Sequence, residues 1–232
     1  MLVVLAVFAG ALCRATFGFG DALVAMPLLL LFVPAEFATP LVGIQFAAVG
    51  VGLVVQNWSS IRWPDVLRLL VPALVGIPLG MLLLTAAPQP VVKKALGGIL
   101  IAYGLWGWAD RSPRLRHPLW AYGFGVLSGA LGAAYNLAGT PLVVYGSLAG
   151  WPMGQFRSSL QGLFAPLGIA MIASHAAAGL WTPDVLFHAA ICLPAIGLGF
   201  WLGSVISKRL SPERFKRLLF PLITAFGVMM LL

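Results

Sequence analysis

The feature that most constrains this chain is a series of apolar stretches, each about as long as a bilayer is thick. Six of them fall at about residues 37–56, 66–87, 91–109, 159–180, 185–207 and 215–232. A helix needs ~20 mostly apolar residues to cross the hydrocarbon core. Of the 232 residues, 61% are hydrophobic and only 9% are charged, which excludes an ordinary soluble domain. The sequence therefore predicts an all-α polytopic membrane protein in the cytoplasmic (inner) membrane.

The charge and cysteine content exclude several other classes of protein. The net charge of +8 would suit nucleic acid in a soluble protein, but here the basic residues gather in the loops between apolar stretches. Such charges orient a protein in the bilayer, and no nucleic-acid partner is expected. Cys13 and Cys192 lie far apart in apolar surroundings, with no CxxC motif and no Cys/His cluster. We expect no metal and no cofactor.

The chain contains a repeat of roughly 120 residues. The motif Pro-Asp-Val-Leu occurs at residues 64–67 and 183–186, offset by 119, and Lys94 matches Lys216 with an offset of 122. Between these points, "VPALVGIPLG" precedes the last apolar stretch of the first half, as "LPAIGLGFWLG" does in the second. Several short motifs with proline, glycine or charged residues that recur in the same order indicate a duplication. We therefore divide the chain into transmembrane repeats at residues 1–114 and 115–232.

Each repeat opens with an apolar segment that is interrupted in its middle. The interruptions are "RATFGFGD" at residues 14–21 and "GAAYNLAGT" at residues 132–140. The flanking pieces have thirteen residues or fewer, and at 1.5 Å per residue a helix of that length reaches only about 20 Å. Two half-helices must therefore share one passage, either as a broken helix that crosses or as a re-entrant hairpin that returns. In both cases three transmembrane helices follow.

The basic residues favour the hairpins. With two hairpins, one side of the membrane collects eleven basic residues and only Lys93 and Lys94 lie opposite, whereas two crossing segments give five against eight. Positive loops stay in the cytoplasm, so both termini are expected outside. The hairpin model also leaves an odd number of spanning helices in each repeat, which inverts one repeat relative to the other. The eleven residues are Arg62, Arg68, Arg111, Arg114, Arg116, Arg157, Lys208, Arg209, Arg214, Lys216 and Arg217.

The two interruptions predict a central anion site. Unpaired backbone is tolerated at membrane depth only where protein or a water-filled cavity surrounds it. After each interruption a helix resumes with free N–H groups and the positive end of its dipole, an arrangement suited to an anion. Asn136 and Thr140 add amide and hydroxyl partners. The alternative is that Asp21 and Asn136 merely cap the resumed helices.

Several other polar residues have two interpretations. Arg14 and Asp21 form either a structural ion pair or a substrate counter-ion with a proton carrier. Arg157 either anchors a helix end or faces the anion with Gln161, and Gln45 and Gln161 are expected to line a cavity because an amide in lipid needs a partner. His175 and His188, near a short turn at the expected outer surface, are assigned interfacial or packing roles, with proton sensing as the alternative.

At these motifs the chain resembles the TauE/SafE sulfite exporters, also called the four-toluene-sulfonate uptake permeases. The resemblance rests on "GFGDALVAMPLL", on "GALGAAYNLAGTPLVVYGSLAG" followed by "FRSSLQGLF", and on the tandem arrangement. The first motif departs from the usual glycine run, since Gly20, Asp21 and Ala22 stand there. The family resemblance implies secondary carriage of sulfite, sulfonates, thiosulfate or other small anions.

We therefore expect a secondary transporter of small sulfur-containing or organic anions, with Asp21 as a candidate for proton coupling. A passive anion channel is an alternative, since half-helices also surround channel sites. A membrane-embedded enzyme or sulfur-relay protein would need a reactive nucleophile or metal set, and neither is visible. A homo-oligomer is compatible with the sequence. The expected substrate-binding residues are Gly18, Phe19, Gly20, Asp21, Gln45, Asn136, Leu137, Gly139, Thr140, Arg157 and Gln161.

Overall fold

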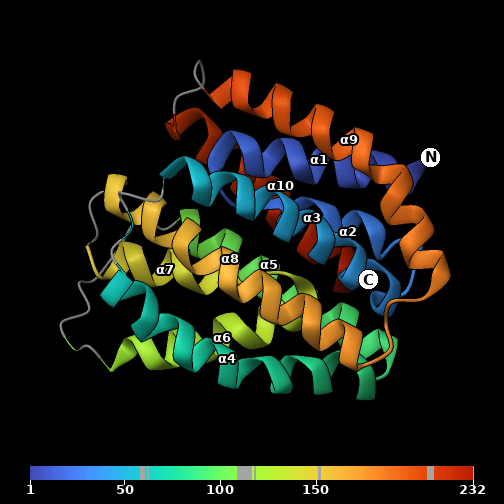
Figure 1. The fold of residues 1–232 in the computed structure, drawn as a ribbon, viewed down its shortest axis with the longest axis horizontal. Helices are drawn as coiled ribbons and strands as arrows, with labels where there is room; N and C mark the ends of the chain where they lie inside the picture. Colours follow the sequence, from blue (N-terminus) through green and yellow to red (C-terminus); the bar gives the residue numbers. More distant parts are fainter. Residues whose placement is uncertain are drawn as a thin grey trace.

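The computed structural model describes residues 1–57, 61, 63–108, 117, 119–150, 153–207 and 212–231. These residues form ten α-helices and no strand, which confirms the all-α prediction (Figure 1). Within the same residues, three helical segments are long and apolar enough to cross a membrane: Trp63–Ala86, Ser159–Ala177 and Pro183–Ser207.

The first five helices and the last five follow one order, a short pair and then three long helices. The short pairs are interrupted where the sequence predicts, at residues 18–20 and 136–138, and the long helices match the predicted spans to within a few residues. The first half contains α1 (Leu2–Phe17), α2 (Asp21–Leu29), α3 (Ala35–Asn57), α4 (Trp63–Ala86) and α5 (Gln89–Trp108). The second contains α6 (Trp120–Tyr135), α7 (Gly139–Leu148), α8 (Met153–Ala177), α9 (Pro183–Ser207) and α10 (Pro212–Leu231).

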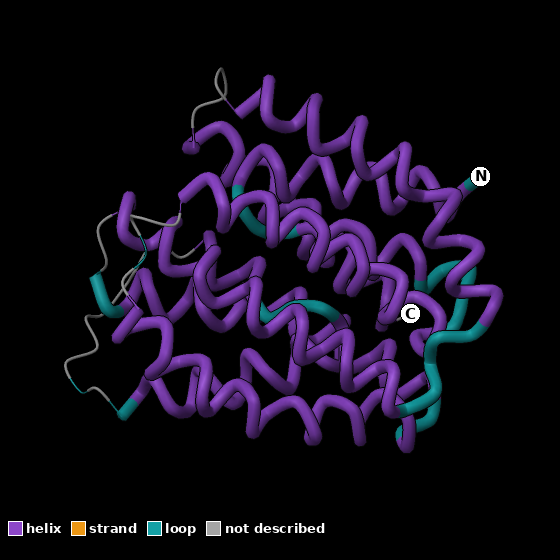
Figure 2. The backbone as a smooth tube through the Cα atoms, viewed as in Figure 1, coloured by secondary structure: helices purple, strands orange, loops and turns teal. Residues whose placement is uncertain are grey.

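Each short pair is an antiparallel hairpin whose turn lies inside the bundle (Figure 2). A Cβ built on Gly10 of α1 would lie 3.0 Å from the Ala25 Cβ of α2, so α2 folds back along α1. In the second pair, the rings of Phe124 and Tyr145 have their centroids 5.7 Å apart. Nearer the turn, the Ser128 hydroxyl donates to the Ala138 carbonyl at 2.8 Å.

Long helices from one half pack on the short helices of the other half. Helix α4 lies against α6 and α9 lies against α1, with α3 beside α8 and α5 beside α10 (Figure 1). Two glycines spaced four residues apart make each contact with a short helix, Gly76 and Gly80 on α4 and Gly199 and Gly203 on α9. Small residues at this spacing let helix backbones approach closely. Each hairpin is therefore held by a helix from the opposite half.

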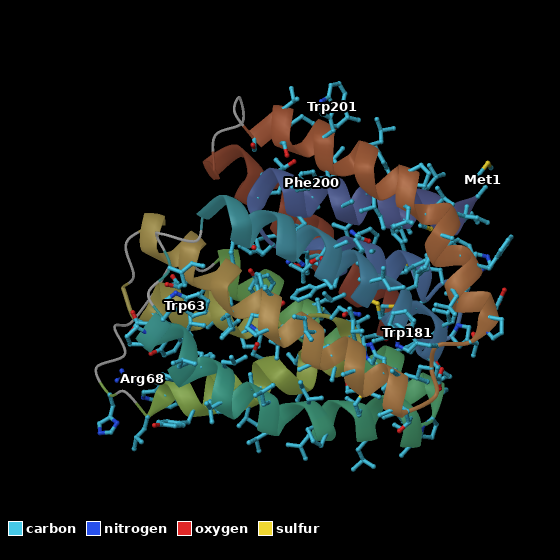
Figure 3. The ribbon with its side chains drawn as sticks, viewed as in Figure 1. Met1, Trp63, Arg68, Trp181, Phe200 and Trp201 are labelled. Atoms are coloured by element: carbon cyan, nitrogen blue, oxygen red, sulfur yellow. The ribbon has the colours of Figure 1, made fainter. Side chains whose placement is uncertain are left out.

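The outer surface is apolar, as a lipid-facing surface requires. Trp201 on α9 is 62% exposed and points away from the bundle (Figure 3). On α4, Val71, Val75 and Leu79 are likewise exposed. Apolar side chains exposed over whole helices identify the face that meets hydrocarbon. The polar side chains discussed below are buried inside this shell.

Candidate functional site

A small cavity lies between the two hairpin turns. Seven of the eleven predicted site residues line it, together with the rings of Phe46 on α3 and Phe164 on α8. The first residues of α2 and α7 are among them, so two helix N-termini border one space. The seven are Phe19, Gly20, Asp21, Asn136, Leu137, Gly139 and Thr140.

At the edge of the cavity, Arg14 and the lining residue Asp21 form a buried ion pair. The Arg14 Nη1 donates to the Asp21 Oδ2 at 2.8 Å, and the side chains are 0% and 4% exposed. Arg14 comes from the last turn of α1 and Asp21 is the first residue of α2, so the turn at residues 18–20 brings them together. A charge at this depth needs such a partner.

The Arg14 guanidinium also lies against two aromatic rings of the cavity wall. Its Cζ is 4.1 Å from the ring centroid of Phe46 and 5.2 Å from that of Phe164. A cation over a ring face is stabilised by the ring's quadrupole. The Nε and Nη2 of Arg14 have no hydrogen-bond partner among the described residues. Arg14 therefore has two charged N–H donors without a described partner. It lies beside the cavity, since the two rings that it contacts also line the cavity.

The second turn is built on Asn136. This residue has a φ of 56° and ends α6, with its backbone N–H donating to the Gly132 carbonyl at 2.7 Å. Its side-chain Nδ2 donates to the Thr39 carbonyl on α3 at 2.7 Å. Asparagine is one of the few residues that tolerates this left-handed conformation. Asn136 thus joins the second turn to the first half of the chain.

The capping interpretation of Asp21 and Asn136 is wrong. Helix α2 has Gly20 as its N-cap and α7 has Ala138, and neither N-terminus receives a side-chain cap hydrogen bond. Asp21 binds Arg14 instead, because an ion pair in a buried site stabilises a carboxylate more than a helix N-terminus does. Asn136 caps the C-terminus of the preceding helix.

Two other predicted site residues, Gln161 and Gln45, are buried but are not among the residues that line the cavity. The Gln161 Nε2 donates to the Gly18 carbonyl at 2.9 Å, which ties α8 to the first turn. Gln45 on α3 is fully buried, and both of its amide atoms are without a partner in the described part of the chain. The side chain of Arg157 lies outside the described residues, although its backbone belongs to α8.

Two residues of this region were missed by the sequence analysis, and a third was given too exposed a place. Phe46 and Phe164 were not singled out, since apolar residues in an apolar helix give no signal of a cation contact. His175 was placed near the outer surface, but it is 0% exposed and its Nε2 lies 3.0 Å from the Ala133 carbonyl. In the sequence His175 lies close to a glycine turn, which suggests exposure. Helices α3 and α6 bury it, and the sequence does not reveal that packing.

Among the residues that the structure describes, the site shows no sign of a metal centre. No group of three or more His, Cys, Asp or Glu side chains that could hold an ion occurs within the described ranges. Cys13 and Cys192 are free and buried, in separate parts of the bundle. The polar groups that surround the cavity are an arginine, a carboxylate, amides and hydroxyls, which suit hydrogen bonding to an oxyanion.

Comparison with known protein families gives a match that covers nearly the whole chain. The family model described as sulfite exporter TauE/SafE matches residues 2–230. No curated protein and no solved structure matches the sequence. A match of this extent, on a helical chain with an apolar exterior and a polar centre, shows the family. The chain belongs to the TauE/SafE sulfite exporter family of membrane transporters.

Proposed function

We propose that this protein is a secondary transporter of a small oxyanion of the sulfite, sulfonate or thiosulfate class across the cytoplasmic membrane. The observation that carries the proposal is the cavity between two helix N-termini, with the buried Arg14 and its two unpartnered donors beside it. An oxyanion accepts several hydrogen bonds at once. Charge-assisted bonds from a guanidinium and backbone N–H groups are the strong kind.

In this proposal the anion and Asp21 compete for Arg14. When an anion takes the guanidinium, the Asp21 carboxylate loses its partner at 2.8 Å while it remains buried. A buried carboxylate without a counter-charge binds a proton, since protonation removes the uncompensated charge. Anion and proton would then be bound together and cross together. The transport step would respond to a pH gradient, and a monovalent anion would move without net charge.

We further propose that the halves 1–114 and 115–232 are inverted repeats with re-entrant hairpins. The identical order of short and long helices and the reciprocal packing of α4 on α6 and α9 on α1 support this. Helices α3 and α9 end, and α4, α6 and α8 begin, at one end of the molecule (Figure 1). In the sequence the basic stretches directly follow or precede these helix ends, so we infer that this end faces the cytoplasm.

A proteoliposome flux panel tests the transport proposal. Sulfite, thiosulfate, sulfoacetate, taurine and acetate are offered with and without a pH gradient. We expect saturable, gradient-driven flux of one or more of the sulfur oxyanions, with exchange against internal anion. Single-channel currents without counter-flow would instead indicate a passive channel.

A matched glycine pair tests the location of the site. A Cβ on Gly139 would lie 3.1 Å from the Phe164 Cζ at the cavity wall, whereas a Cβ on Gly123 would meet nothing within 4 Å. Gly139→Leu should therefore abolish flux and Gly123→Leu should retain it. Equal flux through both, at equal insertion, would move the site elsewhere.

A further inference from the structure

A second polar cluster, formed by His175 and Asn136, lies at the turn of the second hairpin, beside Gly43 of α3. His175, in the last turn of α8, is fully buried, and its Nε2 lies 3.0 Å from the Ala133 carbonyl of α6. A carbonyl only accepts hydrogen bonds, so the Nε2 must carry the hydrogen. In a neutral imidazole the other nitrogen, Nδ1, is then a bare acceptor.

The neighbouring Asn136 presents an acceptor to the same place. Its Nδ2 donates to the Thr39 carbonyl at 2.7 Å, which fixes the orientation of the amide. A Cβ built on Gly43 of α3 would lie 3.4 Å from the Asn136 Oδ1 and 3.4 Å from the His175 Nδ1, so both atoms border the space beside this glycine. Neither atom has a partner among the described residues. Two buried acceptors thus face one space without a donor.

We propose that His175 and Asn136 form a proton-binding site. The His175 Nδ1 takes up a proton, and the new N–H donates a hydrogen bond to the Asn136 Oδ1, directly or through one water. The proton comes from solution, one N–H bond forms, and no bond in the protein breaks. The ring becomes an imidazolium with both nitrogens acting as donors. Protonation converts an unfavourable pair of acceptors into a hydrogen bond.

The surroundings offer partial compensation for the new charge. His175 and Ala133 both lie in the last turns of their helices, where the negative ends of the α8 and α6 dipoles favour a cation. No described residue of α6 or α7 is charged. On α3, Glu36 accepts from the Gln89 side chain. On α4, Asp65 and Arg68 lie near the contact of that helix with Gly162, thirteen residues before His175 on α8.

None of the described residues named above places a carboxylate against the imidazolium, so a bound anion could act as its counter-charge. Asn136 lines the cavity that we propose for the anion, so an anion there would lie near the imidazolium. Binding of either ligand must then favour the other by the same factor. This step rests on the proposed function. It assigns to His175 a proton site that is separate from Asp21 and lies at the second turn instead of the first.

The proton site is tested first without any anion. Nitrogen-15 spectra of histidine-labelled protein in nanodiscs are recorded between about pH 5 and pH 8. The resonances of His175 are identified by their loss in His175→Gln, which keeps a donor for the Ala133 carbonyl. We expect a neutral ring protonated on Nε2 at high pH, and a second N–H as pH falls. A ring that stays neutral throughout, or carries its hydrogen on Nδ1, would overturn the proposal.

A matched pair at Gly43 tests the space itself. Gly43→Ser brings a hydroxyl donor to the two acceptors, while Gly43→Ala adds only the carbon. The serine should hold the ring neutral to lower pH than the alanine does. Equal titration of His175 in both variants would show that the nitrogen does not face this space.

The linkage is tested with methanesulfonate, which stays a monoanion over this range. We expect the parent to bind it about tenfold more tightly at low than at high pH. His175→Gln should keep only the part of this dependence that proton uptake by Asp21 supplies. An unchanged dependence in His175→Gln would refute the linkage and leave the transport proposal intact. Failure of methanesulfonate to bind at any pH would count against the anion site, while the histidine spectra would still decide the proton site.

Discussion

Removal of the Asp21 charge should destabilise the protein through Arg14. In Asp21→Asn the guanidinium keeps its place under the rings of Phe46 and Phe164 but loses its carboxylate. Breaking a buried ion pair by removing one partner costs ~3–5 kcal/mol. The asparagine oxygen, an uncharged acceptor, restores a hydrogen bond to the guanidinium that recovers about 1 kcal/mol. We therefore expect a loss of about 2–4 kcal/mol in the free energy of unfolding, since the pair is 2.8 Å long and nearly unexposed.

The loss of stability in Asp21→Asn comes from the buried Arg14 cation that no longer has a counter-charge. Replacing Arg14 as well should therefore recover stability. Arg14→Met fills similar volume without charge, and the double variant Arg14→Met/Asp21→Asn should be more stable than Asp21→Asn alone. The measurement is equilibrium unfolding in mixed micelles with rising dodecyl sulfate, followed by the fluorescence of the tryptophans. Methanesulfonate should also stabilise Asp21→Asn, since the anion replaces the carboxylate beside Arg14.

Two results would refute this reasoning. A loss below about 0.5 kcal/mol in Asp21→Asn would mean that the guanidinium is compensated by another group. A double variant whose losses simply add would mean that the two charges do not interact.

Three other expectations follow from the packing, the loop charges and the proposed site. Gly199→Ala should lower the free energy of unfolding by about 1–3 kcal/mol, because its Cβ would lie 2.8 Å from a backbone oxygen of α1. Gly197→Ala, whose Cβ would have nothing within 4 Å, should leave it unchanged. Equal unfolding midpoints for the two variants would contradict the close contact. A single cysteine at Ser112, outside the described residues, should resist an impermeant maleimide in intact cells, and rapid labelling would reverse the topology. Arg157→Ala should weaken anion binding roughly tenfold or more and Arg111→Ala should not, as isothermal titration would show; equal losses would remove Arg157 from the site.

The sequence predicted the helices and the interruptions well because their signals are local. Apolar length marks the spans. Gly18 and Gly20 in the first turn and Asn136 in the second mark the breaks. Even so, α1 continues to Phe17, although Arg14 was read as part of the interruption. The reason is that Asp21 neutralises Arg14 inside the bundle, so the charge does not end the helix. Gly18, with a φ of 85°, ends it instead.

The contacts that complete the site are not local, and the sequence carried little trace of them. Phe46 and Phe164 come from opposite halves of the chain and meet Arg14 only because α3 packs on α8. His175 is buried for a similar reason, since α6 supplies the carbonyl that its ring meets. Contacts between helices that are distant in the sequence depend on packing geometry, which hydropathy and the positions of glycine and proline do not predict.

The central claim is that a small oxyanion binds between the two hairpin turns. Its most direct test is a crystal structure of the protein with selenite, an electron-dense analogue of sulfite, with anomalous data collected at the selenium edge. The account predicts one strong anomalous peak in the cavity between residues 19–23 and 136–140, within hydrogen-bonding reach of Arg14 or of the first backbone N–H groups of α2 and α7. A cavity without the peak, with selenite bound only at the basic loops, would contradict it.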